Sequence, residues 1–252
     1  MDTEAKKKLI MQLWKDLTNN KTAGTNIKFK DGKEINVGFV NQFSLHKFIP
    51  NKWFDWESRV DAKIMIIGQD WGPYKALLPY IEKYEEEKRN SDFNYDEYLF
   101  RTFSSRTEKF IFKSLERSYL EKFNTQITKA IWDEFIFTVA VFFTRQGDHF
   151  RGSEFYDEKF GVRTSLPYLK RQIEIVKPKI IMPIGGTAWG MVRDIFGLGK
   201  YPEKISEVIE RLGKEIIKKG DTIIIPNFHP ASHTDPNVQY DIWKRVWENI
   251  SL

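Results

Sequence analysis

The chain has 252 residues, of which 41% are hydrophobic and 15% aromatic, enough to bury the core of one large α/β domain or two small ones. It contains no cysteine, which excludes disulfides, thiolate metal sites, iron–sulfur clusters and a cysteine nucleophile. The net charge of +5 permits a polyanionic partner without requiring one, because 35 acidic residues offset 40 basic ones.

The first part of the chain predicts an N-terminal extension, residues 1–58, that packs on a main domain. Apolar residues at helical spacing predict an amphipathic helix over residues 4–18, with Thr3 placed to cap it. Its lysines favour a solvated face over a phosphate contact. Asp31-Gly32 predicts the turn of a hairpin. There is no signal-peptide core and no apolar run near about 18 residues, so we expect a soluble cytoplasmic protein.

Four unbroken apolar runs further along the chain predict buried strands, because each is short and closed by turn residues. They are residues 64–67, 135–143, 179–186 and 222–228. Helical patterns lie between and after them: residues 107–121, residues 164–177, a helix opened by Gly185-Gly186, residues 203–219 with Gly220-Asp221 as the stop, and a final helix with Ile242, Val246, Trp247 and Ile250. Strands that alternate with helices indicate one α/β domain, residues 59–252, with a central four-stranded parallel sheet in a three-layer α/β/α sandwich.

Polar residues follow every predicted strand, and the carboxyl ends of parallel strands are where α/β proteins bind ligands. The candidates are Gln69-Asp70, residues 145–148, Gly185-Gly186-Thr187 and residues 227–233. A carboxylate and a histidine at one edge, here Asp70 and His229, suit general-base or electrostatic work, although a strand-end aspartate is often only a helix cap.

Two further readings of these strand ends stay open. Free N–H groups after Gly185 suit a phosphate, but a glycine pair equally suits a tight turn. His229 and His233 lie four residues apart, yet Pro230 interrupts any helix there, so a zinc pair is disfavoured and we expect neither metal nor cofactor.

Several segments together resemble the uracil-DNA glycosylase superfamily from about Lys63 to the C-terminus. Gly68-Gln69-Asp70 is similar to the first motif of the GQDPYH class, and Gly72 to the GEAPG form of the iron–sulfur class. Residues 102–115 are similar to the segment of that class whose phenylalanine stacks on the base, which points to Phe103. Residues 167–190 match the family's helix–strand–helix segment, and residues 228–232 (FHPAS) resemble its second motif.

The resemblance implies an enzyme that takes a base out of DNA, cleaves its N-glycosidic bond and serves base-excision repair. It implies that His229 stabilises the negative charge on the departing base and that Asp70 stabilises the sugar cation and orients water. The implied substrate-binding residues are Gly68, Gln69, Gly72, Tyr74, Phe103 and Asn227. The implied DNA contacts are Gly185, Gly186, Ser232 and His233. The partner is then single- or double-stranded DNA, and we expect a monomer.

The chain also departs from the family pattern. The cluster of the iron–sulfur class is absent because there is no cysteine. Val139 and Ala140 stand where a uracil-reading asparagine aligns, and Gly72 replaces a tyrosine that bars the thymine methyl, with Tyr74 two residues later. The identity of the base therefore stays open. The alternatives are a noncatalytic binder of nucleic acid or damaged bases, and a small-molecule enzyme or nucleotide binder that uses Gly185-Gly186.

Overall fold

The computed structural model describes residues 1–18, 25–28, 34–37, 56–69, 106–142, 160–212, 216–229 and 235–250. The chain divides into two compact, interleaved units. The first comprises residues 1–58, 70–102 and 139–175, and the second comprises residues 59–69, 103–138 and 176–252. The division into an N-terminal extension and a main domain at residue 58 stays a prediction.

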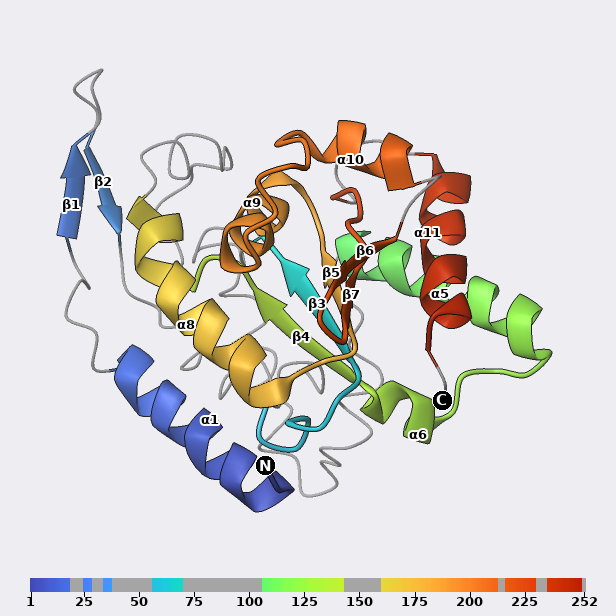
Figure 1. Cartoon of the computed structure of the whole chain (residues 1–252), viewed down its shortest axis with the longest axis horizontal. Coiled ribbons are helices and arrows are strands. Elements are labelled where there is room, and N and C mark those ends of the chain that lie inside the picture. Colours follow the sequence, from blue (N-terminus) through green and yellow to red (C-terminus); the bar gives the residue numbers. More distant parts are fainter. Residues whose placement is uncertain are drawn as a thin grey trace, which may run out of the picture. The chain divides into compact units, whose positions relative to one another are not determined.

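The second unit is built on a five-stranded sheet with the strand order β4-β3-β5-β7-β6 (Figure 1). The strands are β3 (Ile64–Gly68), β4 (Phe135–Val139), β5 (Ile180–Pro183), β6 (Ile217–Lys219) and β7 (Thr222–Ile224). β5 pairs in parallel with β3 and with β7. The α/β class and all four predicted strands are confirmed. Their apolar runs are mostly buried: Ile64 to Ile67 of β3 are 0% exposed, whereas Phe137 of β4 and Ile223 of β7 are partly exposed.

The fifth strand corrects the prediction of a helix over residues 203–219. The helix α10 spans only Ile205–Leu212, and Gly213, a residue that favours helix ends, comes next in the sequence. β6 then pairs antiparallel with β7, and Gly220, at φ +59°, turns the chain between them. Gly220-Asp221 is therefore a hairpin turn rather than a helix stop. Lys218 and Lys219 are exposed on this edge strand, where charge discourages pairing with another chain.

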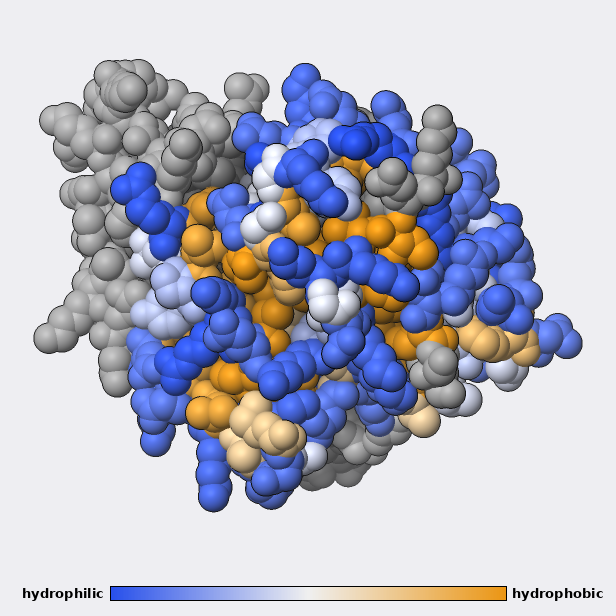
Figure 2. All heavy atoms as spheres, in the orientation of Figure 1, coloured by the Kyte–Doolittle hydropathy of each residue, from blue (hydrophilic) through white to orange (hydrophobic). Residues whose placement is uncertain are grey.

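Two long helices of this unit, α5 (Arg106–Phe123) and α11 (Pro236–Glu248), pack against each other (Figure 1). Trp247 is central to their contact: its ring meets Phe135 of β4 and Tyr119 of α5, and its Nε1 donates to Ser118 Oγ at 2.9 Å. The exposed residues of both helices are mostly charged or polar, although Leu120 and Phe123 of α5 are also exposed. The visible face of the molecule over α11 is largely hydrophilic in Figure 2. Both helices were predicted from this amphipathic pattern.

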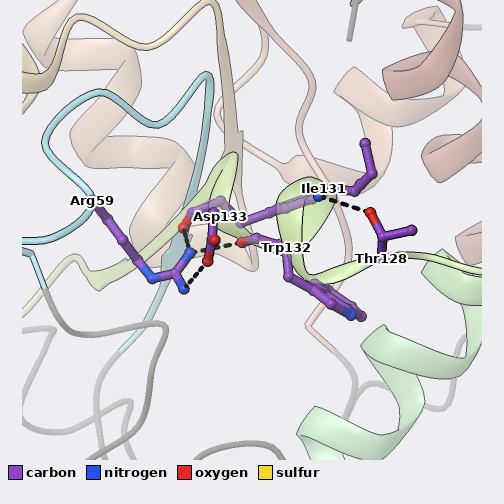
Figure 3. Close-up of polar contacts among 6 residues, drawn as sticks. Arg59, Thr128, Ile131, Trp132 and Asp133 are labelled. Atoms are coloured by element: carbon purple, nitrogen blue, oxygen red, sulfur yellow. Dashed lines mark hydrogen bonds and ion pairs between the residues drawn. The ribbon is translucent and has the colours of Figure 1, made fainter. Parts of the chain in front are cut away.

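A buried arginine ties the start of the second unit to the segment before β4 (Figure 3). Arg59 is 7% exposed and donates to the carbonyls of Trp132 and Phe135, at 2.7 and 2.9 Å, and to the Asp133 carboxylate at 2.9 Å. The short helix α6 (Lys129–Asp133) lies in this segment and was not predicted. Thr128 Oγ1 caps it by accepting from the N–H of Ile131.

The first unit contains α1 (Thr3–Thr18), α8 (Phe160–Val176, whose last residue falls in the other unit) and the antiparallel hairpin of β1 (Thr25–Lys28) and β2 (Glu34–Val37). Both helices and the hairpin were predicted, and the turn Asp31-Gly32 lies outside the described residues. Asp2, not Thr3, caps α1, since its carboxylate accepts from the N–H of Ala5 at 2.8 Å. The helix thus begins one residue earlier than predicted.

An ion pair joins α1 to α8 within the first unit. Arg171 donates to the Asp16 carboxylate, which also accepts from the Gln12 amide at 2.8 Å. These hydrogen bonds, that of Arg171 first, hold the pKa of Asp16 below its usual value. In the described part of the chain, no helix is both long enough and apolar enough to cross a bilayer.

The remaining helix of the second unit is α9 (Gly186–Ile195), which follows β5 and was predicted from its glycine pair. Ala188, Trp189, Met191 and Val192 form its buried side. Trp189 Nε1 donates to the Pro202 carbonyl at 2.9 Å, which fixes the connection from α9 to α10. The buried side chains of α9 and this hydrogen bond hold the helix in place, so its N-terminus has a fixed position beyond the end of β5.

Candidate active site

The carboxyl ends of β3, β5 and β7 meet at one edge of the sheet in the second unit. Ile184 N–H donates to the Ile67 carbonyl at 2.8 Å, which continues the pairing of β5 with β3 past the last strand residue. Asn227 forms a parallel bridge with Ile184, and its N–H donates to the Pro183 carbonyl at 2.8 Å. Three short polar segments therefore come together: Gly68-Gln69, Gly185-Gly186 and Asn227 to His229.

Gly185 lies directly against His229. The Gly185 N–H donates to the Asn227 carbonyl at 2.9 Å, and a Cβ built on Gly185 would stand 3.2 Å from His229 Cβ and 3.6 Å from Cδ2. Gly185 has φ +86° and ψ 169°, a conformation that is essentially restricted to glycine. Glycine is thus favoured at position 185 for two reasons: its backbone conformation, and the short distance to His229, which leaves little space for a Cβ. His229 itself is partly exposed, as a group that acts on a ligand has to be.

Asn227 is a buried amide whose hydrogen-bonding capacity is largely unused. The residue is 0% exposed, and its Nδ2 donates to the Met182 sulfur at 3.5 Å. Its Oδ1 has no hydrogen-bond partner in the described part of the structure. A buried polar atom without a partner costs about 1–3 kcal/mol. Asn227 therefore does not serve the stability of the sheet.

The start of α9 lies at this same edge, and the first turn of a helix leaves backbone N–H groups without an intrahelical partner. Gly185 is the N-cap and supplies no side-chain hydrogen bond. Gly186 is exposed, and no described residue lies within 4 Å of the place where its Cβ would be. An uncapped helix N-terminus carries partial positive charge and favours anions.

Sequence reasoning missed one residue of this region, Gln239 of α11. It is 0% exposed, and its Nε2 donates to the Phe228 carbonyl at 3.2 Å. Phe228 is the residue before His229. The signal was a glutamine within the buried apolar stripe of a helix, at helical spacing from Ile242 and Trp243.

The structure brings together six of the predicted site residues, and six others lie outside the described residues. Those brought to the edge are Gly68, Gln69, Gly185, Gly186, Asn227 and His229. Those outside the described residues are Asp70, Gly72, Tyr74, Phe103, Ser232 and His233, as are residues 145–148. Val139, the last residue of β4, and Ala140 are buried and apolar. No group of three or more histidine, aspartate or glutamate side chains that could hold a metal ion occurs among the described residues.

A histidine at the carboxyl edge of a mostly parallel sheet, beside a glycine-opened helix, defines an α/β protein with a candidate active site at its strand ends. Residues 54–248 match the model of the uracil-DNA glycosylase superfamily. The chain belongs to this superfamily.

A curated relative supports the same assignment over a shorter stretch. The chain is 35% identical over 77 residues to a type-4 uracil-DNA glycosylase of Sulfurisphaera tokodaii. The match covers 29% of this chain and 33% of the relative, so the chain matches about a third of that protein's length. The similarity supports a DNA glycosylase family. It does not extend the activity of the whole relative to this chain.

Proposed function

We propose that this protein is a DNA glycosylase that hydrolyses the N-glycosidic bond of uracil, or of another deaminated or modified base, after the nucleotide is flipped out of DNA. The observation that carries the proposal is the position of His229, held against Gly185 at the carboxyl edge of the sheet. The superfamily match, residues 54–248, includes both Gly185 and His229 and all but the last four residues of the second unit.

The proposed reaction divides the developing charge between two groups. As the bond between C1′ and the base nitrogen breaks, its electron pair stays with the base, and the sugar becomes an oxocarbenium ion. A donor hydrogen bond from His229 stabilises the anionic base, and the Asp70 carboxylate stabilises the cation and orients the water that adds to C1′. The base takes up a proton, and an abasic site remains in the DNA.

Other residues of the proposal bind rather than react. Gln69, together with Gly68, Gly72 and Tyr74, contacts the base, and Phe103 stacks on it. The buried amide of Asn227 lies beside Ile184, two residues before His229, and its Oδ1, which has no partner among the described residues, is an acceptor for a polar group that enters there. The N-terminus of α9, at Gly185 and Gly186, takes a backbone phosphate, with Ser232 and His233 beside it.

The test is base release from single- and double-stranded oligonucleotides that carry uracil, hypoxanthine or xanthine. Wild type is expected to release at least one of them. His229→Ala is expected to lose about a hundredfold in rate, the value of one oxyanion donor, and Asp70→Asn most of the activity. Asp221→Asn is the control, because this exposed carboxylate lies at the opposite end of β7 from His229. An inert wild type on the whole panel refutes the enzyme.

A second candidate is a noncatalytic binder of damaged DNA on the same scaffold. It is favoured by the end of β4, where Val139 and Ala140 are buried and offer no amide to a base edge. The net charge of +5 suits contact with phosphates. Binding that weakens steeply with salt, without formation of an abasic product, would support this candidate over the enzyme.

A further inference from the structure

Gln239 is a buried amide on a helix whose other buried residues are apolar. These are Ile242, Trp243, Val246 and Trp247. Its Nε2 donates to the Phe228 carbonyl at 3.2 Å, while its Oε1 has no partner among the described residues. One neutral hydrogen bond stabilises the folded state by about as much free energy as one unpaired buried oxygen costs. Gln239 is thus not explained by the stability of the core.

The contact of Gln239 falls on the peptide that carries His229. The Phe228 carbonyl and the His229 nitrogen belong to one planar peptide group, so holding the oxygen fixes the direction in which the chain enters His229. Regular pairing with β5 ends just before this point, at Asn227. Pro230, which follows His229, has no N–H to offer. Gln239 therefore holds the chain where the sheet no longer does.

The helix that carries Gln239 is itself firmly anchored. Trp243 and Trp247 meet Phe135 of β4, and Trp247 also bonds Ser118 of α5. Asp235 caps the helix start by accepting from the N–H of Asn237 at 2.9 Å. A residue on such a helix is a fixed point from which a neighbouring loop is positioned.

The opposite side of the same segment is held by β5 and α9. The Gly185 N–H binds the Asn227 carbonyl, and Gly185 lies so close to His229 that a Cβ built on it would stand 3.2 Å from His229 Cβ. We propose that Gln239 is a positioning residue that, together with Gly185, sets the orientation of His229 toward the base. This inference rests on the proposed function, because it assigns Gln239 a role in the reaction of His229.

The test compares three variants in the full chain. Gln239→Leu removes the donor, and Gln239→Asn keeps the amide but shortens it by one methylene, so that it no longer reaches Phe228. Ile242→Val is the matched control, at a buried apolar residue one turn further along α11. We expect both Gln239 variants to lose roughly 10- to 100-fold in kcat at nearly unchanged KM, as misplacement of a reacting group does, and the control to keep both values.

A second readout does not depend on activity. NMR of the imidazole resonances follows the ring of His229, assigned with His229→Ala among the four histidines of the chain. We expect the His229 ring signal to move in both Gln239 variants and to stay in place in Ile242→Val. An unmoved ring signal with an unchanged kcat in a folded Gln239→Leu or Gln239→Asn protein overturns the inference.

The two proposals fail in different ways. An inert wild type whose His229 signal still moves on substitution of Gln239 refutes the glycosylase and leaves the positioning contact standing. An active wild type with unaffected Gln239 variants refutes the positioning role alone. Equal losses of kcat in Gln239→Leu and Ile242→Val would mean that α11 acts only through general stability, which also refutes it.

Discussion

The substitution Gly185→Ala tests how closely the β5–α9 turn and His229 depend on each other. Alanine at φ +86° and ψ 169° occupies a region that other residues avoid, at a cost of about 1–3 kcal/mol. Its Cβ would stand 3.2 Å from His229 Cβ, tighter than ordinary van der Waals contact, so the imidazole has to move by a few tenths of an ångström. The backbone before His229 is held in two places: Asn227 is bridged to Ile184, and the Phe228 carbonyl accepts from Gln239. The backbone of His229 therefore has little freedom to shift and make room for the added methyl group.

Both effects are measurable in one protein. Denaturant unfolding is expected to show the loss of about 1–3 kcal/mol, and base release is expected to fall by up to about a hundredfold because the donor is misplaced. Gly190→Ala is the control: Gly190 lies within α9, and none of the residues that the structure describes stands within 4 Å of a Cβ built on it. Alanine there is expected to stabilise the helix by about 0.5–1 kcal/mol with activity unchanged.

The result that refutes this reasoning is a Gly185→Ala protein as stable and as active as Gly190→Ala. It would mean that the turn accepts a side chain and that His229 does not rely on the space that Gly185 leaves. A loss of stability with full activity would refute only the contact with the imidazole.

Two predictions concern the parts that hold each unit together. Arg59→Met leaves two backbone carbonyls without their donor, so we expect a loss of about 2–4 kcal/mol in urea unfolding, whereas Asp133→Asn, at a half-exposed carboxylate, is expected to cost less than about 1 kcal/mol. Similar losses for both would contradict the role of the carbonyls. Asp16→Asn removes a partly exposed ion pair, so we expect at most about 1 kcal/mol at pH 7. Because the folded pKa of Asp16 is lowered, this difference should persist down to the unfolded pKa of about 3.9 and vanish below the folded one; a difference that grows toward acid would contradict it.

Four strands of the sheet could be predicted because each contains an unbroken run of apolar residues, which is typical of a buried strand. Ile64 to Ile67 and Ile180 to Ile184 admit no exposed face, which is typical of parallel strands. β6 could not be predicted in the same way. It has three residues, only Ile217 is buried, and the sequence before it continues a helical repeat. Its pairing with β7, not its own composition, makes it a strand.

The site could be predicted as a set of strand ends but not as a set of contacts. Parallel pairing sends the ends of β5 and β7 to one edge, which was enough to expect Gly185 and His229 near each other. Their direct contact depends on the register that opposes Ile184 to Asn227, and no local pattern encodes that register. Gln239 lies eleven residues after Phe228 along the chain, and only the packing of α11 brings it back.

The polar residues near His229 stand out against the composition of their own elements. Asn227 follows the isoleucines at the end of β7, and Gln239 interrupts the apolar side of α11. Each is fully buried, and each has an oxygen without a partner among the described residues, so within this part of the chain an apolar side chain of similar size would leave the core at least as stable. Local rules of folding are broken most often where a protein acts on something else. Asn227 and Gln239 both lie beside the peptide that leads into His229. The two buried amides are therefore found where the candidate active site needs a fixed imidazole, and we expect them to serve the site rather than stability.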